Sequence, residues 1–161
     1  SPTIAESDIT NTRVPMRRLT VLLCFALATT FAQAEEWIIK RKIASSFSDA
    51  RDAVVMAIEN RGLVINNVSH MADMLNRTGA DLGATRQIYG QAEIIEFCSA
   101  SLSRKMMELA PHNIVLCPFA ISIYTLPGDK NTTWLSYRQP SGAAASLVGP
   151  LLREIVAEAG N

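Results

Sequence analysis

The sequence has no surplus of charge of either sign and lacks the short motifs typical of enzymes. Its 161 residues include 15 Lys plus Arg and 15 Asp plus Glu, which gives a formal net charge of +0. Proteins that neutralise nucleic-acid phosphates or bind anionic membranes carry a basic surplus, so we expect neither kind of partner. The sequence contains no G-x-S-x-G, no H-E-x-x-H and no phosphate-binding glycine loop. These absences favour a non-catalytic protein.

Apolar runs long enough to span a membrane are also lacking. The longest run, residues 19–31, falls short of the roughly 20 residues that a spanning helix needs. It follows Met16 and two arginines and ends in Ala32-Gln33-Ala34, the order typical of a secretory signal peptide. We therefore expect residues 16–34 to be a signal peptide that is cleaved before Glu35. Residues 1–15 are interpreted as a non-native upstream segment, and the mature protein is expected to be periplasmic or secreted, without a membrane span.

Residues 35–161 are predicted to form one domain, since 48% of the sequence is hydrophobic and only 19% is charged. Apolar periodicity, helix caps and turn residues predict a strand at the start of the domain, a helix from Ser46 to Arg61 and a second strand at 63–68. The later elements are a short helix from residue 69, a strand at 86–98, a helix at 99–110, a long strand at 113–126, a strand at 132–140 and a helix at 149–160. The order β-α-β-(α)-β-α-β-β-α predicts an α+β fold with helices packed on one mixed sheet.

Four segments carry a resemblance to a known family. They are "ENRGLVINN", "RQIYGQAEIIEF", "ELAP" and "IVLCPFAISIY", the last with Pro118 and Tyr124 at characteristic positions. With these segments the chain resembles the domain of unknown function 302 family from about Trp37 to Ala159. The resemblance implies the fold and a homodimer, and it supplies no established reaction. The export signal and the cysteines distinguish an exported subgroup.

Cysteine is scarce, and the roles of the cysteines stay open. Cys24 lies in the predicted signal peptide, so Cys98 and Cys117 remain in an oxidising compartment, where a disulfide would stabilise the domain by roughly 3 kcal/mol. If the helix between them connects neighbouring parallel strands, the two residues are offset by over about 10 Å, more than a disulfide allows. Alternatively, Cys117 is a small core residue. A third interpretation is a reactive Cys98, with its pKa lowered by the following helix start and by Arg104 and Lys105.

Histidine and methionine provide a candidate metal site. His70 and Met74 are four residues apart and Met71 is adjacent, so a helix would place soft ligands typical of copper on one face. The alternative is that the methionines fill the core and His70 caps a helix. Zinc is less favoured, because the sequence has no Cys-x-x-Cys or His-x-x-x-His pair.

These features predict a non-catalytic binding or accessory domain whose partner is a small ligand or another periplasmic protein. The alternative prediction is a thiol-based redox or copper-handling protein that uses Cys98, Cys117 and His70. That alternative requires the fold to bring all three residues to one edge of the sheet.

Overall fold

The computed structural model describes residues 37–161, so the predicted signal peptide, its Cys24 and the upstream segment lie outside the described residues. The elements are β1 (Ile38–Ile43), α2 (Phe47–Glu59), β2 (Val64–His70), α3 (Met71–Gly79), β3 (Ala92–Cys98), α4 (Ala100–Leu109), the 3-10 helix η1 (Pro111–Leu116), β4 (Phe119–Tyr124), β5 (Thr133–Arg138), the 3-10 turn η2 (Gly142–Ala144) and α5 (Ala145–Ala159).

The strands form one five-stranded sheet in the order β1-β5-β4-β3-β2. The predicted α+β fold with helices on a single sheet is confirmed, but the sheet is not mixed. All four strand pairings are antiparallel. The helix between β3 and β4 therefore leads from the end of one strand back to the start of its antiparallel neighbour.

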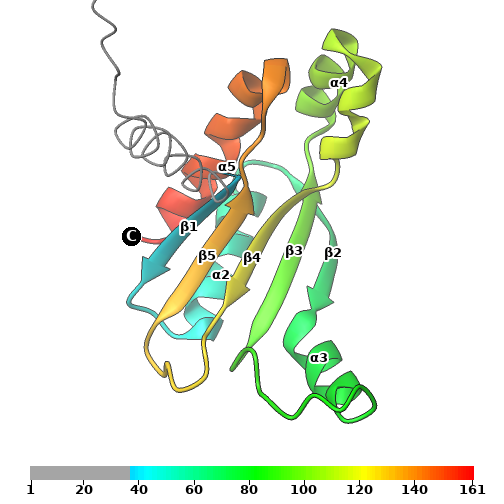
Figure 1. The fold of residues 1–161 in the computed structure, drawn as a ribbon. Coiled ribbons are helices and arrows are strands. Elements are labelled where there is room, and N and C mark those ends of the chain that lie inside the picture. The colour runs from blue at the N-terminus through cyan, green and yellow to red at the C-terminus, as the bar shows by residue number, and fades with distance from the viewer. Residues whose placement is uncertain (1–36) are drawn as a thin grey trace, which may run out of the picture. The chain divides into compact units, whose positions relative to one another are not determined.

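Helices α2 and α5 lie together behind the sheet in Figure 1, with the other face turned to the viewer. Helix α2 begins where expected, because the Ser46 side chain accepts a hydrogen bond from the backbone N–H of Asp49 at 3.1 Å. Its predicted apolar face is confirmed: the buried residues are Phe47, Ala50, Val54, Ala57 and Ile58. The inward residues of the strands meet this face, among them Ile95, Phe97, Phe119, Ile121, Ile123 and Leu135.

The predicted long strand at 113–126 is wrong in its first half. Residues Pro111–Leu116 form η1, and β4 begins only at Phe119. Pro111 suits the first turn of a helix, while Pro118 lacks the N–H that a strand ladder needs. Val115, which a strand over residues 113–126 would place on the same face as Phe119 and Ile121, is 79% exposed as a result.

The terminal helix begins earlier than predicted. Helix α5 starts at Ala145, so Pro150 lies inside it and not in its first turn. Of the residues that helical spacing places on its apolar face, Leu152, Ile155, Val156 and Ala159 are buried, whereas Leu151 is half-buried. None of the helices within residues 37–161 combines the length and the apolar character needed to cross a membrane.

The packing of α2 predicts that Val54→Asp strongly destabilises the domain. Val54 is 0% exposed, so the substitution buries a carboxylate without a partner, and we expect a loss of at least about 3 kcal/mol in the free energy of unfolding. Urea unfolding followed by circular dichroism measures it. The matched control is Met56→Asp on the same helix, because Met56 is 60% exposed. Equal stability of the two variants would contradict the assignment of the buried face.

Candidate functional site

The face of the sheet opposite α2 and α5 carries the residues that the strand alternation turns away from the core. No described helix crosses this face in Figure 1. We call it the open face. Its central positions on β4 and β5 are small, with Ser122 opposite Ser136 in the register. Ile94 on β3 lies beside Ser122, and Lys40 on β1 lies beside Ser136. Because these central side chains are small and their neighbours are larger, the middle of the open face is recessed.

A row of ring-bearing side chains crosses one end of the open face. The register places Lys42 opposite Trp134, and Trp134 opposite Tyr124. The Trp134 and Tyr124 rings are stacked at 7° with centroids 6.4 Å apart, and the Lys42 ammonium lies 5.6 Å from the Trp134 ring centroid. Tyr89 continues the row by meeting Tyr124 edge-on at 5.5 Å. We call Tyr89, Tyr124 and Trp134 the aromatic row.

A close backbone approach holds Tyr89 in this row. The Gly90 N–H donates to the Thr125 carbonyl and the Thr125 N–H donates to the Gln91 carbonyl, both at 2.9 Å. The Thr125 hydroxyl accepts a third bond from the Gln91 N–H at 3.0 Å. A Cβ on Gly90 would lie only 2.7 Å from that hydroxyl oxygen. Glycine at this position therefore allows the loop before β3 to close against β4.

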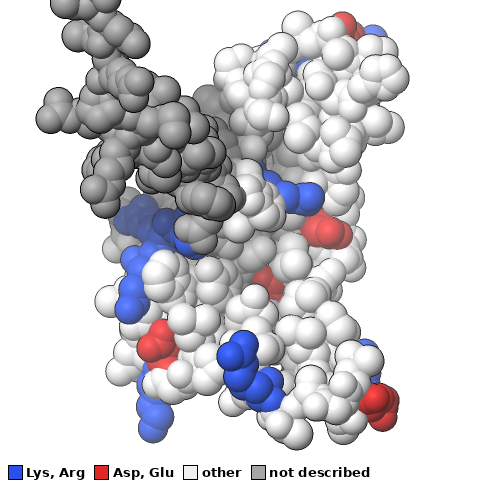
Figure 2. Space-filling view, in the orientation of Figure 1, with Lys and Arg blue, Asp and Glu red and all other residues white. Residues whose placement is uncertain are grey.

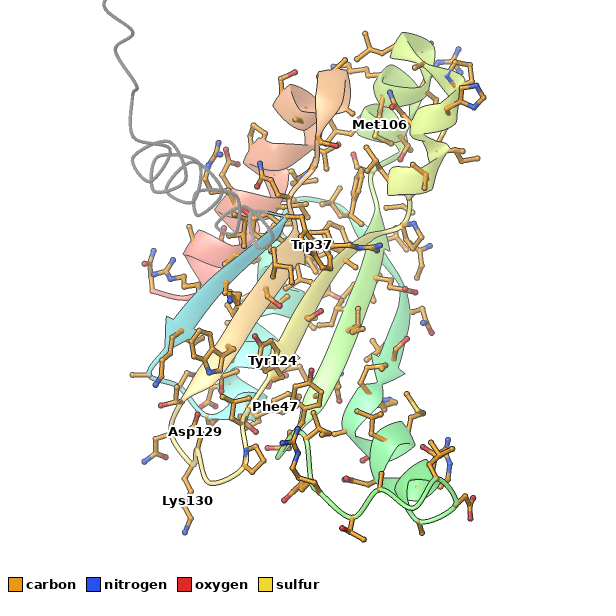
Figure 3. The ribbon with its side chains drawn as sticks, in the orientation of Figure 1. Trp37, Phe47, Met106, Tyr124, Asp129 and Lys130 are labelled. Carbon is orange, nitrogen blue, oxygen red and sulfur yellow. The ribbon has the colours of Figure 1, made fainter. Side chains whose placement is uncertain are left out.

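Two members of the aromatic row, Tyr89 and Tyr124, wall a hollow of about 250 Å³ in the open face. Ser122, Ser136 and Ile94 line the hollow with them. The rest of the lining is Ile38, Lys40, Met71, Ala92, Glu93 and Ile123, so an ammonium group and a carboxylate both border the hollow. Figure 3 shows Tyr124 on the open face and Trp37 toward the other end of the sheet. The hollow thus combines aromatic walls with hydroxyl groups and a nearby ammonium group.

The Tyr124 hydroxyl in this hollow stays protonated well above neutral pH. Burial raises its pKa above the ordinary tyrosine value, and a hydrogen bond with Ser136 only partly opposes that rise. A protonated hydroxyl both donates and accepts hydrogen bonds. Tyr124 is therefore suited to orient a ligand and not to act as a base.

Charge is distributed unevenly over the open face. Lys40, Lys42 and Arg138 project from β1 and β5, and Figure 2 shows Lys and Arg side chains along the β1 side, with Asp and Glu side chains nearer the centre. Glu96 carries negative charge on the β3 side of this face, and it accepts a hydrogen bond from Asn67 at 3.0 Å. The β1 side of the hollow is therefore the more attractive side for an anionic group.

Comparison with known proteins identifies the family. The family described as "Domain of unknown function DUF302" matches residues 39–161. The chain belongs to the DUF302 family. The crystal structure of an uncharacterized conserved DUF302 protein from Bacillus stearothermophilus matches with a TM-score of 0.55 and 14% sequence identity, covering 76% of this chain and 88% of that one. At this identity the match shows a shared fold. No curated protein matches the chain.

In this DUF302 domain the two cysteines lie at one end of the sheet, far from the aromatic row. Phe97 is paired with Phe119, so Cys98 follows one member of the last ladder pair and Cys117 lies two residues before the other. The predicted offset of more than about 10 Å assumed parallel strands, and that assumption is wrong because β3 and β4 are antiparallel. Both thiols are free and half-buried, and the Ser103 hydroxyl lies 3.4 Å from the Cys117 sulfur.

The pKa of Cys98 shifts in the direction opposite to the predicted one. Burial raises the pKa of the Cys98 thiol, and the nearby Cys117 adds to the rise. Two groups near Cys98 that were expected to stabilise a thiolate, or that lie at the start of α4, already interact with other residues. The Ser99 side chain accepts from the Leu102 N–H at the start of α4, and Arg104 is paired with Glu108 at 2.9 Å.

His70 belongs to a different group of side chains, at the opposite end of β3 from Cys98. In the β2–β3 ladder His70 is paired with Glu93, whereas Cys98 is paired with Val64. Its Nδ1 lies 3.1 Å from one Glu93 oxygen, and the other oxygen accepts from Arg51 Nε at 2.8 Å. Five residues of strand correspond to roughly 17 Å. The predicted shared site of Cys98, Cys117 and His70 is therefore wrong.

The soft-ligand set of His70, Met71 and Met74 stays a prediction. Met71 lines the hollow of the open face, while His70 lines a separate polar cavity of about 110 Å³ with Asp73 and Glu93. Within residues 37–161 no group of three or more His, Cys, Asp or Glu side chains is placed to hold a metal ion.

A second cavity, of about 230 Å³, lies at the end of the sheet where β4 begins. Its lining includes Trp37, Leu116, Pro118, Val148 and Leu152. Arg138 and Gln139 also line this cavity, so it too offers polar groups to a ligand. The hollow of the open face differs from it in its two tyrosine rings and two serine hydroxyls.

The environment of Cys98 predicts the pH dependence of its alkylation. Because burial raises the thiol pKa, the reactive thiolate should form at a higher pH than in an exposed cysteine. We expect the midpoint of iodoacetamide modification of Cys98 to lie above that of a cysteine in an unstructured peptide. Cys117→Ser should leave most of this shift in place, because burial is its main cause. Peptide mass spectrometry follows Cys98 individually, and a midpoint below that of the peptide would contradict the account.

Proposed function

We propose that the protein is a non-catalytic binding module that takes a small, planar, anionic ligand into the hollow of the open face. The observation that carries the proposal is the hollow itself, about 250 Å³ in volume and walled by the Tyr89 and Tyr124 rings, with Trp134 stacked on Tyr124. Aromatic side chains provide much of the affinity of small-molecule sites, and a few polar groups fix the orientation of the ligand.

The size and chemistry of the hollow support this class of ligand. Pockets for drug-sized molecules measure about 300–1,000 Å³, so a hollow of this size suits a compound of one or two rings. A flat ring can lie against Tyr124, with the hydroxyls of Ser122 and Ser136 available to polar substituents. Lys40 lines the β1 side of the hollow and Glu93 lines its β3 side, so a carboxylate or sulfonate on the ligand is expected to lie toward β1.

The proposed role is binding and not catalysis. The pKa of the Tyr124 hydroxyl, which lines the hollow, is shifted away from neutrality. General bases work best with a pKa near the operating pH. The Glu93 carboxylate, which lines the hollow, is already engaged by Arg51 and His70.

We further propose that the protein belongs to an exported subgroup and acts in the periplasm or outside the cell. The support is the sequence pattern of residues 16–34. The homodimer implied by the family resemblance stays a prediction.

Binding is tested with 8-anilinonaphthalene-1-sulfonate, an anionic probe whose flat two-ring naphthalene unit matches the expected ligand and whose fluorescence increases when it is transferred out of water. We expect saturable binding with one site per chain. Ser122→Trp fills the floor of the hollow from a central strand that tolerates aromatic residues. This variant should weaken binding by about tenfold or more, a cost of about 1.4 kcal/mol.

The matched control is Trp37→Ala, which removes an aromatic side chain from the second cavity and leaves the hollow intact. It should bind the probe like the parent protein. Near-ultraviolet circular dichroism verifies that both variants are folded, because loosely packed proteins also bind this probe. Binding that is lost in Trp37→Ala and kept in Ser122→Trp would refute the assignment to the open face.

The proposed export predicts the first residue of the mature protein. When the full chain is expressed in a bacterium, the protein recovered from the periplasm should begin at Glu35, because cleavage follows Ala34. Intact-mass spectrometry of the periplasmic and cytoplasmic fractions measures this. A mature-size species confined to the cytoplasm, or a periplasmic species that keeps residues before Ala34, would contradict the proposal.

A further inference from the structure

We propose that the second cavity, at the end of the sheet where β4 begins, binds an aliphatic carboxylate, with the chain in the cavity and the carboxylate on Arg138. The site is separate from the hollow of the open face and does not depend on ligand binding there. Its support is an apolar cavity of about 230 Å³, whose lining includes exposed apolar side chains and an arginine without an ion-pair partner in residues 37–161.

The cavity is surrounded by the ends of several elements. The Gln139 N–H donates to the Trp37 carbonyl at 2.7 Å, just beyond the β1–β5 ladder. Phe119 is the first residue of β4, and it lines the cavity together with Val148 and Leu152 of α5. The cavity therefore lies between the strand ends and the first turns of α5. Figure 3 shows Trp37 at this end of the sheet.

The lining suits an aliphatic chain. Much of it consists of branched or cyclic aliphatic side chains, namely Val115, Leu116, Pro118, Val148 and Leu152. Val115 is exposed, and Trp37 at the same cavity is 57% exposed. Exposed apolar groups that lie together are characteristic of interaction sites. A water molecule takes up about 30 Å³ in the liquid and a methylene group is of similar size, so the cavity has room for roughly seven methylene groups.

The anionic end of the ligand is inferred from Arg138, which lines the cavity. Its side chain makes no ion pair with the part of the chain that the structure describes, whereas Arg51, Arg61 and Arg104 each bind a carboxylate. A guanidinium group matches a carboxylate with two parallel N–H···O bonds. Gln139, also on the lining, adds an amide donor. An alkanoate therefore places each of its two parts against a matching surface.

The two cavities favour different ligands. The hollow of the open face presents the rings of Tyr89 and Tyr124 and two serine hydroxyls, which suit a flat ring with polar substituents. The second cavity presents aliphatic side chains and a guanidinium group, which suit a flexible chain with one anionic end. We therefore expect ligands of the two classes to bind independently.

The test is isothermal titration calorimetry of the full chain with sodium butanoate, hexanoate and octanoate, at concentrations at which the acids are monomeric. We expect one site per chain. The affinity should rise about fourfold for each added methylene group, because each group leaves water on binding.

The head group is tested with Arg138→Gln, a change on an exposed side chain that removes the positive charge. It should weaken octanoate binding about tenfold or more and leave binding of the neutral 1-octanol unchanged. The matched control is Lys130→Gln, which removes the same charge from the β4–β5 hairpin at the opposite end of the sheet (Figure 3). The control should bind octanoate like the parent protein, and circular dichroism verifies that both variants are folded.

Several results would overturn the proposal. Equal affinity for the three acids would show that the chain stays in water, and unchanged octanoate binding in Arg138→Gln would place the carboxylate elsewhere. Displacement of 8-anilinonaphthalene-1-sulfonate by octanoate, or loss of octanoate binding in Ser122→Trp, would place the acid in the hollow of the open face. Octanoate binding kept in Ser122→Trp would support a separate site, whether or not the hollow binds the fluorescent probe.

Discussion

The pairing of β3 with β4 is the constraint on which both candidate sites depend. Its register fixes two ends of the sheet at once. At one end Ala92 lies opposite Tyr124, next to the loop that carries Tyr89, and at the other Phe97 lies opposite Phe119 beside the two cysteines. A shift by one residue would turn every side chain of β3 to the other face, and would remove Ile95 and Phe97 from the core. The core therefore holds in place both the aromatic row and the cysteine pair.

The two faces of the sheet have different physical roles. One is covered by α2 and α5, and its side chains are almost fully buried, so its composition is dictated by packing. The other keeps two rings, an isoleucine and several hydroxyls around a hollow. Exposed apolar and aromatic groups that packing does not require are characteristic of interaction sites. The clamp between Gly90 and Thr125 supports this view, because it holds Tyr89 against Tyr124 with three hydrogen bonds.

Much of the fold could be predicted from the sequence, because the local signals agree with one another. The cap at Ser46 and the apolar stripe of α2 both appear in the structure as expected. Strand direction could not be predicted in this way, since a helix can join strands of either orientation, and the error over β3 and β4 led to a wrong separation of Cys98 and Cys117. The strand predicted at 113–126 failed because the apolar run before Pro118 forms a turn.

The candidate site was harder to predict than the fold. Cys98 and Cys117 could be identified as candidates because cysteine is scarce in the sequence. The antiparallel pairing of β3 with β4 then placed both at the same end of the sheet. His70 was found as well, but its pairing with Glu93 depends on the β2–β3 register. Trp134 and Tyr89 were missed, because their contacts with Tyr124 join residues far apart in the chain. Lys42 and Trp134 lie on strands far apart in the sequence, and only the pairing of β1 with β5 places them side by side.

Chemical-shift mapping of the labelled protein tests the central claim most directly. Titration with 8-anilinonaphthalene-1-sulfonate should shift the backbone amide signals of residues around the hollow, above all Tyr89, Ser122 and Ser136. Signals of residues at the second cavity, such as Leu116 and Leu152, should stay in place. Shifts that concentrate at the second cavity and spare Ser122 and Ser136 would contradict the assignment of ligand binding to the open face.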